Sequence, residues 1–112
     1  MINVVNKRRH KATPNDIYIG RGSPLGNPFT HRPLSGTKAS FKVDSVIAAI
    51  MAYKDYIGKE LEENEEIIGV FEEIKRKHRE GEVNLVCYCK PGPCHGDVVK
   101  AIILEDCGLD LP

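Results

Sequence analysis

The chain has 112 residues, of which 41% are hydrophobic and 29% charged, and sixteen basic residues balance sixteen acidic ones. That length suits one domain over residues 1–112, large enough to fold without a metal or a disulfide. A net charge of zero argues against a main role in binding nucleic acid. No apolar run reaches the ~18 residues of a membrane span, and MINVVNKRRH lacks a secretory signal. We therefore expect a cytoplasmic protein with reduced cysteines.

The first forty residues predict two short strands and a long loop. β-Branched residues favour a strand in MINVVN (1–6), and IYIG at 17–20 favours a second one. The segment KRRHKATPND between them ends in clustered turn formers and is interpreted as a loop. From 21 to 40 the glycines and prolines exclude regular structure. So long a loop in a small domain is usually functional or disordered, and the apolar anchors Leu25 and Phe29 favour function.

Two amphipathic helices are expected in the middle of the chain. Apolar residues spaced i, i+3 and i+4 predict the first helix over 43–63, with Asp44 as a suitable N-cap. The same spacing predicts the second helix over 64–81, which Gly81 ends. The heavily charged stretch KELEENEEIIGVFEEIKRKHREGE is most simply a solvated helix face.

The last third of the chain predicts a strand, a turn and a buried helix. VNLVCYC at 83–89 is the most apolar strand, which favours a central position in the sheet. A rigid KPGP turn leads to a helix over 94–108 that Gly108 ends. The expected fold class is α/β, a single small domain with a short mixed sheet of about three strands covered by three helices. Its C-terminal strand–turn–helix is Rossmann-like.

The motif CYCKPGPCHGD, residues 87–97, lies where the last strand passes through a turn into a helix. Ligands of open α/β sheets bind beyond the carboxyl ends of the strands, and free N–H groups at a helix start attract anions. Cys94 in that position is expected to have a lowered pKa, with His95 or Asp97 as general acid or base. Gly96 allows a ligand to approach the backbone. The alternative for Asp97 is structural, as the capping-box partner of Cys94.

The same motif contains the side chains of a candidate zinc site. Cys87 and Cys89 are two apart on a strand and point to one face, and Cys94 and His95 would complete a Cys3His set. Against zinc, structural sites usually place two to four residues between paired cysteines, and here a single residue intervenes. The alternative is that these thiols pack beneath the sheet, as we expect for Cys107 on the apolar face of the last helix. No cofactor is therefore expected, with zinc as the alternative.

A second cluster lies in the long loop, in GRGSPLGNPF at 20–29. Arg21 leaves the second strand where its guanidinium would reach a phosphate, and Arg8 after the first strand adds positive charge. The turn at Gly26 and Asn27 would place an amide against a base or ribose edge. The pattern is neither a P-loop nor a dinucleotide-binding motif, so the alternative is a surface loop with a solvated arginine.

Together these motifs are similar to one small family. The motifs are an early N-x-R, then IGR…S-x-L-G-N-P-F, then Y-K-D-Y on a helix, then C-aromatic-C-K-P-x-P-C-H-G-D. In this combination they resemble domain of unknown function 4326, which is found in bacteria and their phages. The resemblance covers essentially the whole chain and implies one architecture, one pocket and a broadly nucleotide-handling α/β fold, but no reaction. Tyr88 stands where relatives are expected to carry tryptophan, and REGEVN where they carry a more basic turn. The matching positions are Asn6, Arg8, Ile19, Gly20, Arg21, Gly26, Asn27, Pro28, Phe29, Tyr53, Tyr56, Cys87, Cys89, Cys94, His95, Gly96 and Asp97.

Three functions remain open at this point. The first is a pocket between the GRGSPLGNPF loop and the start of the CHGD helix, which binds and sequesters a nucleotide or related phosphorylated small molecule, with Tyr53 or Tyr56 against the base or sugar. The second is an enzyme acting on a nucleotide or nucleoside derivative, with the catalytic candidates Cys94, His95 and Asp97. The third is a zinc-binding structural or interaction module. The expected partner is a small molecule, with neither a membrane nor nucleic acid, and a homo-oligomer is left open.

Overall fold

The computed structural model describes residues 1–30 and 41–108, with side chains as far as Glu105. Three helices and a small sheet confirm the α/β class expected from the sequence. Within the described residues, none of the helices is long and apolar enough to span a bilayer. The elements in chain order are β1 (Ile2–Asn6), β2 (Asp16–Tyr18), β3 (Phe29–Thr30), β4 (Phe41–Lys42), α1 (Val46–Glu63), α2 (Glu65–Glu80), β5 (Val83–Cys87) and α3 (His95–Gly108).

β5 is the centre of a three-stranded sheet with the order β1–β5–β2. Both neighbours run parallel to it, and Val4 and Ile17 lie opposite Leu85 from the two sides. All residues of β5 are buried, which confirms the central position predicted from its apolar sequence. The strand ends at Cys87, so the predicted extension to residue 89 is wrong and those residues begin the turn.

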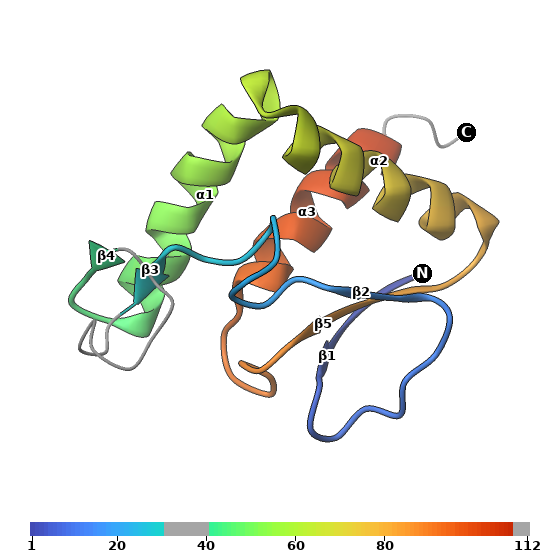
Figure 1. Cartoon of the computed structure of the whole chain (residues 1–112), viewed down its shortest axis with the longest axis horizontal. Coiled ribbons are helices and arrows are strands. Elements are labelled where there is room, and N and C mark those ends of the chain that lie inside the picture. Colours follow the sequence, from blue (N-terminus) through green and yellow to red (C-terminus); the bar gives the residue numbers. More distant parts are fainter. Residues whose placement is uncertain (31–40, 109–112) are drawn as a thin grey trace.

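The three helices lie together on one face of this sheet (Figure 1). Side chains alternate along β5, and Leu85 and Cys87 join the hydrophobic core. The other face has a row of polar side chains, in which Asn84 accepts a hydrogen bond from Asn3 at 3.0 Å and donates one to Asp16 at 3.1 Å. The core therefore lies between helices and sheet, and the carboxyl ends of the strands stay available for a site.

The helix boundaries follow local capping. The Ser45 side chain caps α1 by accepting a first-turn N–H at 3.0 Å, so the predicted cap Asp44 is one residue too early. Asn64 ends α1 and starts α2, where its side chain accepts two N–H groups at 3.1 and 3.2 Å. Gly81 ends α2 as predicted, with a φ of 153° that favours glycine.

A second, two-stranded sheet interrupts the predicted loop. β3 pairs in parallel with β4, and the rings of Phe29 and Phe41 stack with centroids 5.4 Å apart. The expectation of no regular structure is therefore wrong at Phe29 and Thr30, because a partner strand from beyond the loop supplies the hydrogen bonds. Residues 31–40 of the predicted loop lie outside the described residues, as does the side chain of Cys107.

Candidate functional site

The candidate site lies beyond the carboxyl ends of the three parallel strands. β1 ends at Asn6, β2 at Tyr18 and β5 at Cys87, and the turn at 88–94 then leads into α3 (Figure 1). The Asn6 side chain donates a hydrogen bond to the Lys90 carbonyl oxygen at 2.6 Å, which ties this turn to the end of β1. Parallel strands end at one edge, so residues far apart in the sequence meet here.

A pocket of about 470 Å³ opens at this edge. The loop after β2 forms one wall, and the turn before α3 forms the other. The first turns of α1 contribute an apolar side through Val46 and Ile50. Both motifs singled out from the sequence thus line the same pocket. Its polar and aromatic lining includes Arg8, Tyr18, Arg21, Asn27, Tyr88 and His95.

Arg21 lines the pocket and also braces the loop. Its Nε donates to the Asn27 carbonyl oxygen at 3.2 Å, and its Nη2 donates to the Phe29 carbonyl oxygen at 2.9 Å. A guanidinium has five N–H groups, so others remain for a molecule in the pocket. Besides the phosphate contact expected from the sequence, Arg21 therefore has a structural role in the loop.

Gly26 and Asn27 shape the loop from within. A Cβ at Gly26 would lie 2.8 Å from the carbonyl oxygen of Gly20, so the turn packs closely on itself. The Asn27 side chain is buried, donates to the Ala49 carbonyl oxygen at 3.2 Å and accepts the Phe29 N–H at 2.9 Å. Asn27 lines the pocket, but its Nδ2 already holds the loop against α1 and its Oδ1 is already bonded within the loop.

Tyr53 and Tyr56, the expected base or sugar contacts, lie behind the pocket wall and do not line it. Tyr53 is fully buried, and its hydroxyl donates to the Leu25 carbonyl oxygen at 2.8 Å. Its ring packs edge-on against His95, with centroids 5.0 Å apart. Tyr56 packs edge-on against Phe29 at 6.2 Å. Neither tyrosine lies where it would contact a molecule in the pocket, because this face of α1 packs against the inner side of the loop.

Two exposed tyrosines line the pocket instead, and neither was predicted from the sequence as a ligand contact. The rings of Tyr18, at the end of β2, and Tyr88, just after β5, meet edge to face with centroids 6.2 Å apart. The guanidinium of Arg8 lies 5.5 Å from the centre of the Tyr88 ring, and the Lys7 ammonium 5.1 Å from that of Tyr18. The alternation Ile-Tyr-Ile at 17–19 was the available signal, because it turns the aromatic ring away from the core.

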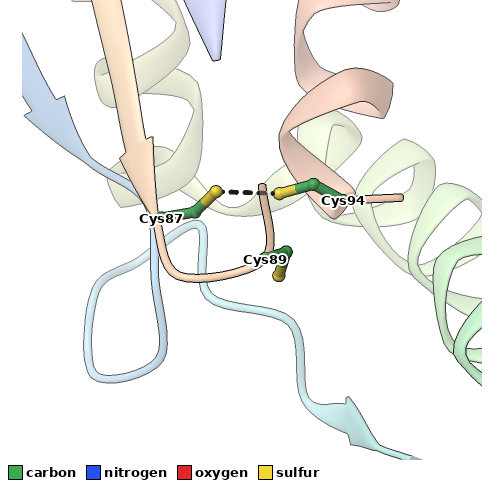
Figure 2. A group of neighbouring side chains, drawn as sticks. All are labelled: Cys87, Cys89 and Cys94. Atoms are coloured by element: carbon green, nitrogen blue, oxygen red, sulfur yellow. Dashed lines mark hydrogen bonds between the residues drawn. The ribbon is translucent and has the colours of Figure 1, made fainter. Parts of the chain in front are cut away.

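Three cysteines gather where β5 gives way to α3. Cys87 ends β5, Cys89 lies in the turn and Cys94 immediately precedes α3, and their Sγ atoms all lie within 4.8 Å of one another. Figure 2 shows the thiols of Cys87 and Cys94 pointing toward each other. Their Sγ atoms lie 3.0 Å apart. The narrow spacing of Cys87 and Cys89 is no obstacle to a shared ion, because the strand ends between them. Three thiols this close can hold a metal such as zinc.

Hydrogen bonding among the thiols reverses the acidity expected for Cys94. The pKa of Cys94 is raised because its thiol donates to Cys87, interacts with Cys89 and is buried. Hydrogen bonds from Cys89 and Cys94 hold the pKa of Cys87 well below its ordinary range. The pKa of Cys89 is raised, first by its hydrogen bond to Cys87. The pKa of Cys94 is therefore shifted in the direction opposite to the one expected from the helix start.

The start of α3 is satisfied by the chain's own acceptors. The Asp97 carboxylate accepts the Cys94 N–H at 3.2 Å, as the capping-box alternative predicted, and pairs with the Lys90 ammonium at 2.7 Å. The Gly96 N–H donates to Cys94 Sγ at 3.3 Å, and the Asp97 N–H donates to the Cys94 carbonyl oxygen at 3.0 Å. These groups are not free to cradle an anion. Asp97 itself is exposed and lies outside the pocket lining.

His95 connects α3 to the end of β2. Its Nε2 donates to the Ile19 carbonyl oxygen at 2.6 Å, so Nδ1 carries the lone pair and lies 3.8 Å from Cys94 Sγ. Burial lowers the pKa of His95 and favours the neutral imidazole. A Cβ at Gly96 would lie 2.8 Å from side-chain atoms of both Ile19 and Val4. Gly96 therefore permits close packing of α3 on the sheet, in place of the ligand approach expected from the sequence.

Comparisons with known proteins bear on the family of the chain. No curated protein and no solved structure matches the sequence. A family profile described as "Domain of unknown function (DUF4326)" matches residues 2–105, which include the pocket loop, both pocket tyrosines and the cysteine cluster. Over nearly its whole length, the chain therefore belongs to the DUF4326 family, as its motifs indicated.

Proposed function

We propose that the pocket binds a nucleotide or a related phosphorylated small molecule and sequesters it. The observation that carries this proposal is the grouping of two arginines and two exposed tyrosines, Arg8, Arg21, Tyr18 and Tyr88, around one pocket of about 470 Å³. Pockets of several hundred Å³ at the carboxyl ends of parallel strands commonly hold small-molecule ligands.

The proposal assigns the phosphate to Arg8 and Arg21. Guanidinium groups form charge-assisted hydrogen bonds with phosphate oxygens, whereas the N–H groups of Cys94, Gly96 and Asp97 at the start of α3 are already engaged. The ring of Tyr88, or that of Tyr18, would stack with the base, since both are exposed at the pocket. The apolar side chains of Val46 and Ile50 would exclude water from the buried part of the ligand.

Sequestration is favoured over catalysis by the placement of the candidate nucleophile. The Cys94 thiol is buried, points to Cys87 and is not part of the pocket lining. Of the three catalytic candidates, only His95 lines the pocket, and its Nε2 already donates to Ile19. A nucleophile needs a base within hydrogen-bonding reach and access to the substrate, and Cys94 lacks that access here.

The test is a thermal-shift screen with nucleotides, cyclic nucleotides and ADP-ribose-like compounds at up to millimolar concentration. At least one compound is expected to raise the melting temperature of the protein. Arg8→Ala is expected to weaken its binding about tenfold through loss of one charged contact. The matched control is Arg9→Ala, which removes the same charge from a residue that does not line this pocket. No shift with any compound, or equal losses in both variants, would contradict the proposal.

A second proposal concerns the cysteine cluster. We infer that Cys87, Cys89 and Cys94 bind one zinc ion, since three thiols within 4.8 Å offer the soft ligands that zinc prefers. The proposal places the protein in the cytoplasm, where thiols remain reduced. Elemental analysis of protein purified without chelator is expected to give one zinc per chain. The variant Cys89→Ser should lose it and Cys107→Ser should retain it, and a metal-free wild type would refute the inference.

A further inference from the structure

We propose that a zinc ion held by Cys87, Cys89 and Cys94 keeps its fourth coordination position open toward the pocket, where it takes a donor atom of the bound molecule or a water. The inference deepens the proposed function and rests on it, because the open position is assigned to the molecule in the pocket. It differs from a structural zinc site, in which a fourth protein ligand closes the coordination.

The three sulfur atoms have nearly the spacing that zinc requires. With Zn–S bonds of about 2.3 Å, the sulfurs of a tetrahedral site lie about 3.8 Å apart. Those of Cys87 and Cys94 are 3.0 Å apart, and all three sulfurs lie within 4.8 Å of one another. Shifts on the order of 1 Å would place the three sulfurs at three corners of a tetrahedron.

A backbone N–H group bonds to one of these sulfurs in the way that favours a thiolate. The Gly96 N–H donates to Cys94 Sγ at 3.3 Å. Hydrogen bonds of this kind orient the ligands of a metal and stabilise their charge. Cys94 thus has the outer contact of a metal ligand.

The open side of the cluster faces the pocket. Cys89 is a member of the cysteine cluster and also lines the pocket, and it is exposed whereas Cys87 and Cys94 are buried. Among the described residues, no fourth histidine, cysteine or carboxylate has a ligand atom within 4.8 Å of all three sulfurs. His95 is the competing ligand. Its Nδ1 lies 3.8 Å from Cys94 Sγ but is not within 4.8 Å of all three sulfurs, and its Nε2 is bonded to the Ile19 carbonyl oxygen. The fourth corner is therefore left to the pocket.

The charge of the site indicates the class of donor. Three thiolates and Zn²⁺ would carry one net negative charge, and Arg21 in the pocket wall offsets part of it. A further anionic donor such as a phosphate oxygen would be repelled by this charge. A neutral donor suits the position better, and a nucleotide-like molecule has one in a ring nitrogen of its base. The phosphate would then remain with Arg8 and Arg21, which line the same pocket.

Cobalt substitution tests the inference on the full chain. Co²⁺ in a thiolate site gives charge-transfer and visible bands that report its ligands. We expect one cobalt per chain, and we expect imidazole, a small neutral donor, to shift the visible bands by taking the open position. The intensity of the charge-transfer bands should fall in Cys89→Ser and stay unchanged in Cys107→Ser. Failure to bind cobalt, visible bands insensitive to saturating imidazole, or an unaltered spectrum in Cys89→Ser would overturn the inference.

The two proposals fail separately. An imidazole-sensitive cobalt site in a protein that binds no compound of the nucleotide panel would overturn the proposed function but leave an open metal site. Nucleotide binding combined with an imidazole-insensitive cobalt site would overturn only the open coordination position. In that case X-ray absorption at the zinc edge would show three sulfurs and one nitrogen in the zinc protein with an empty pocket, identifying His95 as the fourth ligand.

Discussion

Replacing Gly26 with alanine tests whether the loop after β2, which contains GRGSPLGNPF at 20–29, packs closely on itself. A Cβ there would lie 2.8 Å from Gly20 O, 3.0 Å from Arg21 Cα and 3.2 Å from Ser23 O, all of them backbone atoms. The φ of Gly26 is not positive, so alanine meets no backbone strain and the cost comes from space alone. Overpacking of this kind costs about 1–3 kcal/mol, offset by about 0.4–1 kcal/mol from the lower entropy of the unfolded chain.

The expected net loss in the free energy of unfolding is about 1–2 kcal/mol, which lowers the melting temperature by about 4–16 °C in a domain of this size. Urea denaturation followed by circular dichroism measures the loss. The matched control is Gly69→Ala, because Gly69 is exposed on α2 and a Cβ there meets no atom within 4 Å. That change should stabilise the protein by about 0.5–1 kcal/mol. A Gly26→Ala protein as stable as the wild type would refute the described packing of the loop.

Three further predictions concern stability. Tyr53→Phe leaves a buried carbonyl oxygen without its donor and should lower the free energy of unfolding by about 1–3 kcal/mol. Tyr56→Phe on the same helix should change it by no more than about 0.5 kcal/mol. Equal losses of stability in thermal denaturation would contradict the hydrogen bond that anchors the loop on α1. Asn64→Ala removes the N-cap of α2 and should cost about 1 kcal/mol, while Asn64→Asp keeps the acceptor and should cost less in the same measurement. Burial raises the pKa of Asp16, but hydrogen bonds from the 10–13 segment and β5 outweigh it and lower this pKa from 3.8 to about 2. The ionised Asp16 therefore stabilises the fold in full above pH 3.8, and this stabilisation is lost as the pH falls to about 2. The advantage of the wild type over Asp16→Asn in urea denaturation should shrink across that window, and an advantage independent of pH would contradict the assignment.

The elements could be predicted from the sequence where the signal is local. The i, i+3, i+4 spacing placed α1 and α2, and Gly81 marked the end of α2, because helix periodicity and capping involve residues within a few positions of one another. The apolar run of β5 indicated a central strand, since central strands are the most buried ones of a small sheet. The capping interaction of Asp97 with Cys94 was predictable for the same reason, as the two are three residues apart.

Contacts between distant segments decided the rest. The sequence placed Tyr53 on a helix but could not show that its hydroxyl meets Leu25, and it did not reveal that Tyr18 and Tyr88 meet at the pocket. It determined by itself the class of fold, the helices and the two motifs that line the pocket. Only the tertiary structure decided which side chains face that pocket and that three thiols meet beside it, because exposure and contact depend on neighbours brought together by packing and by the register of parallel strands.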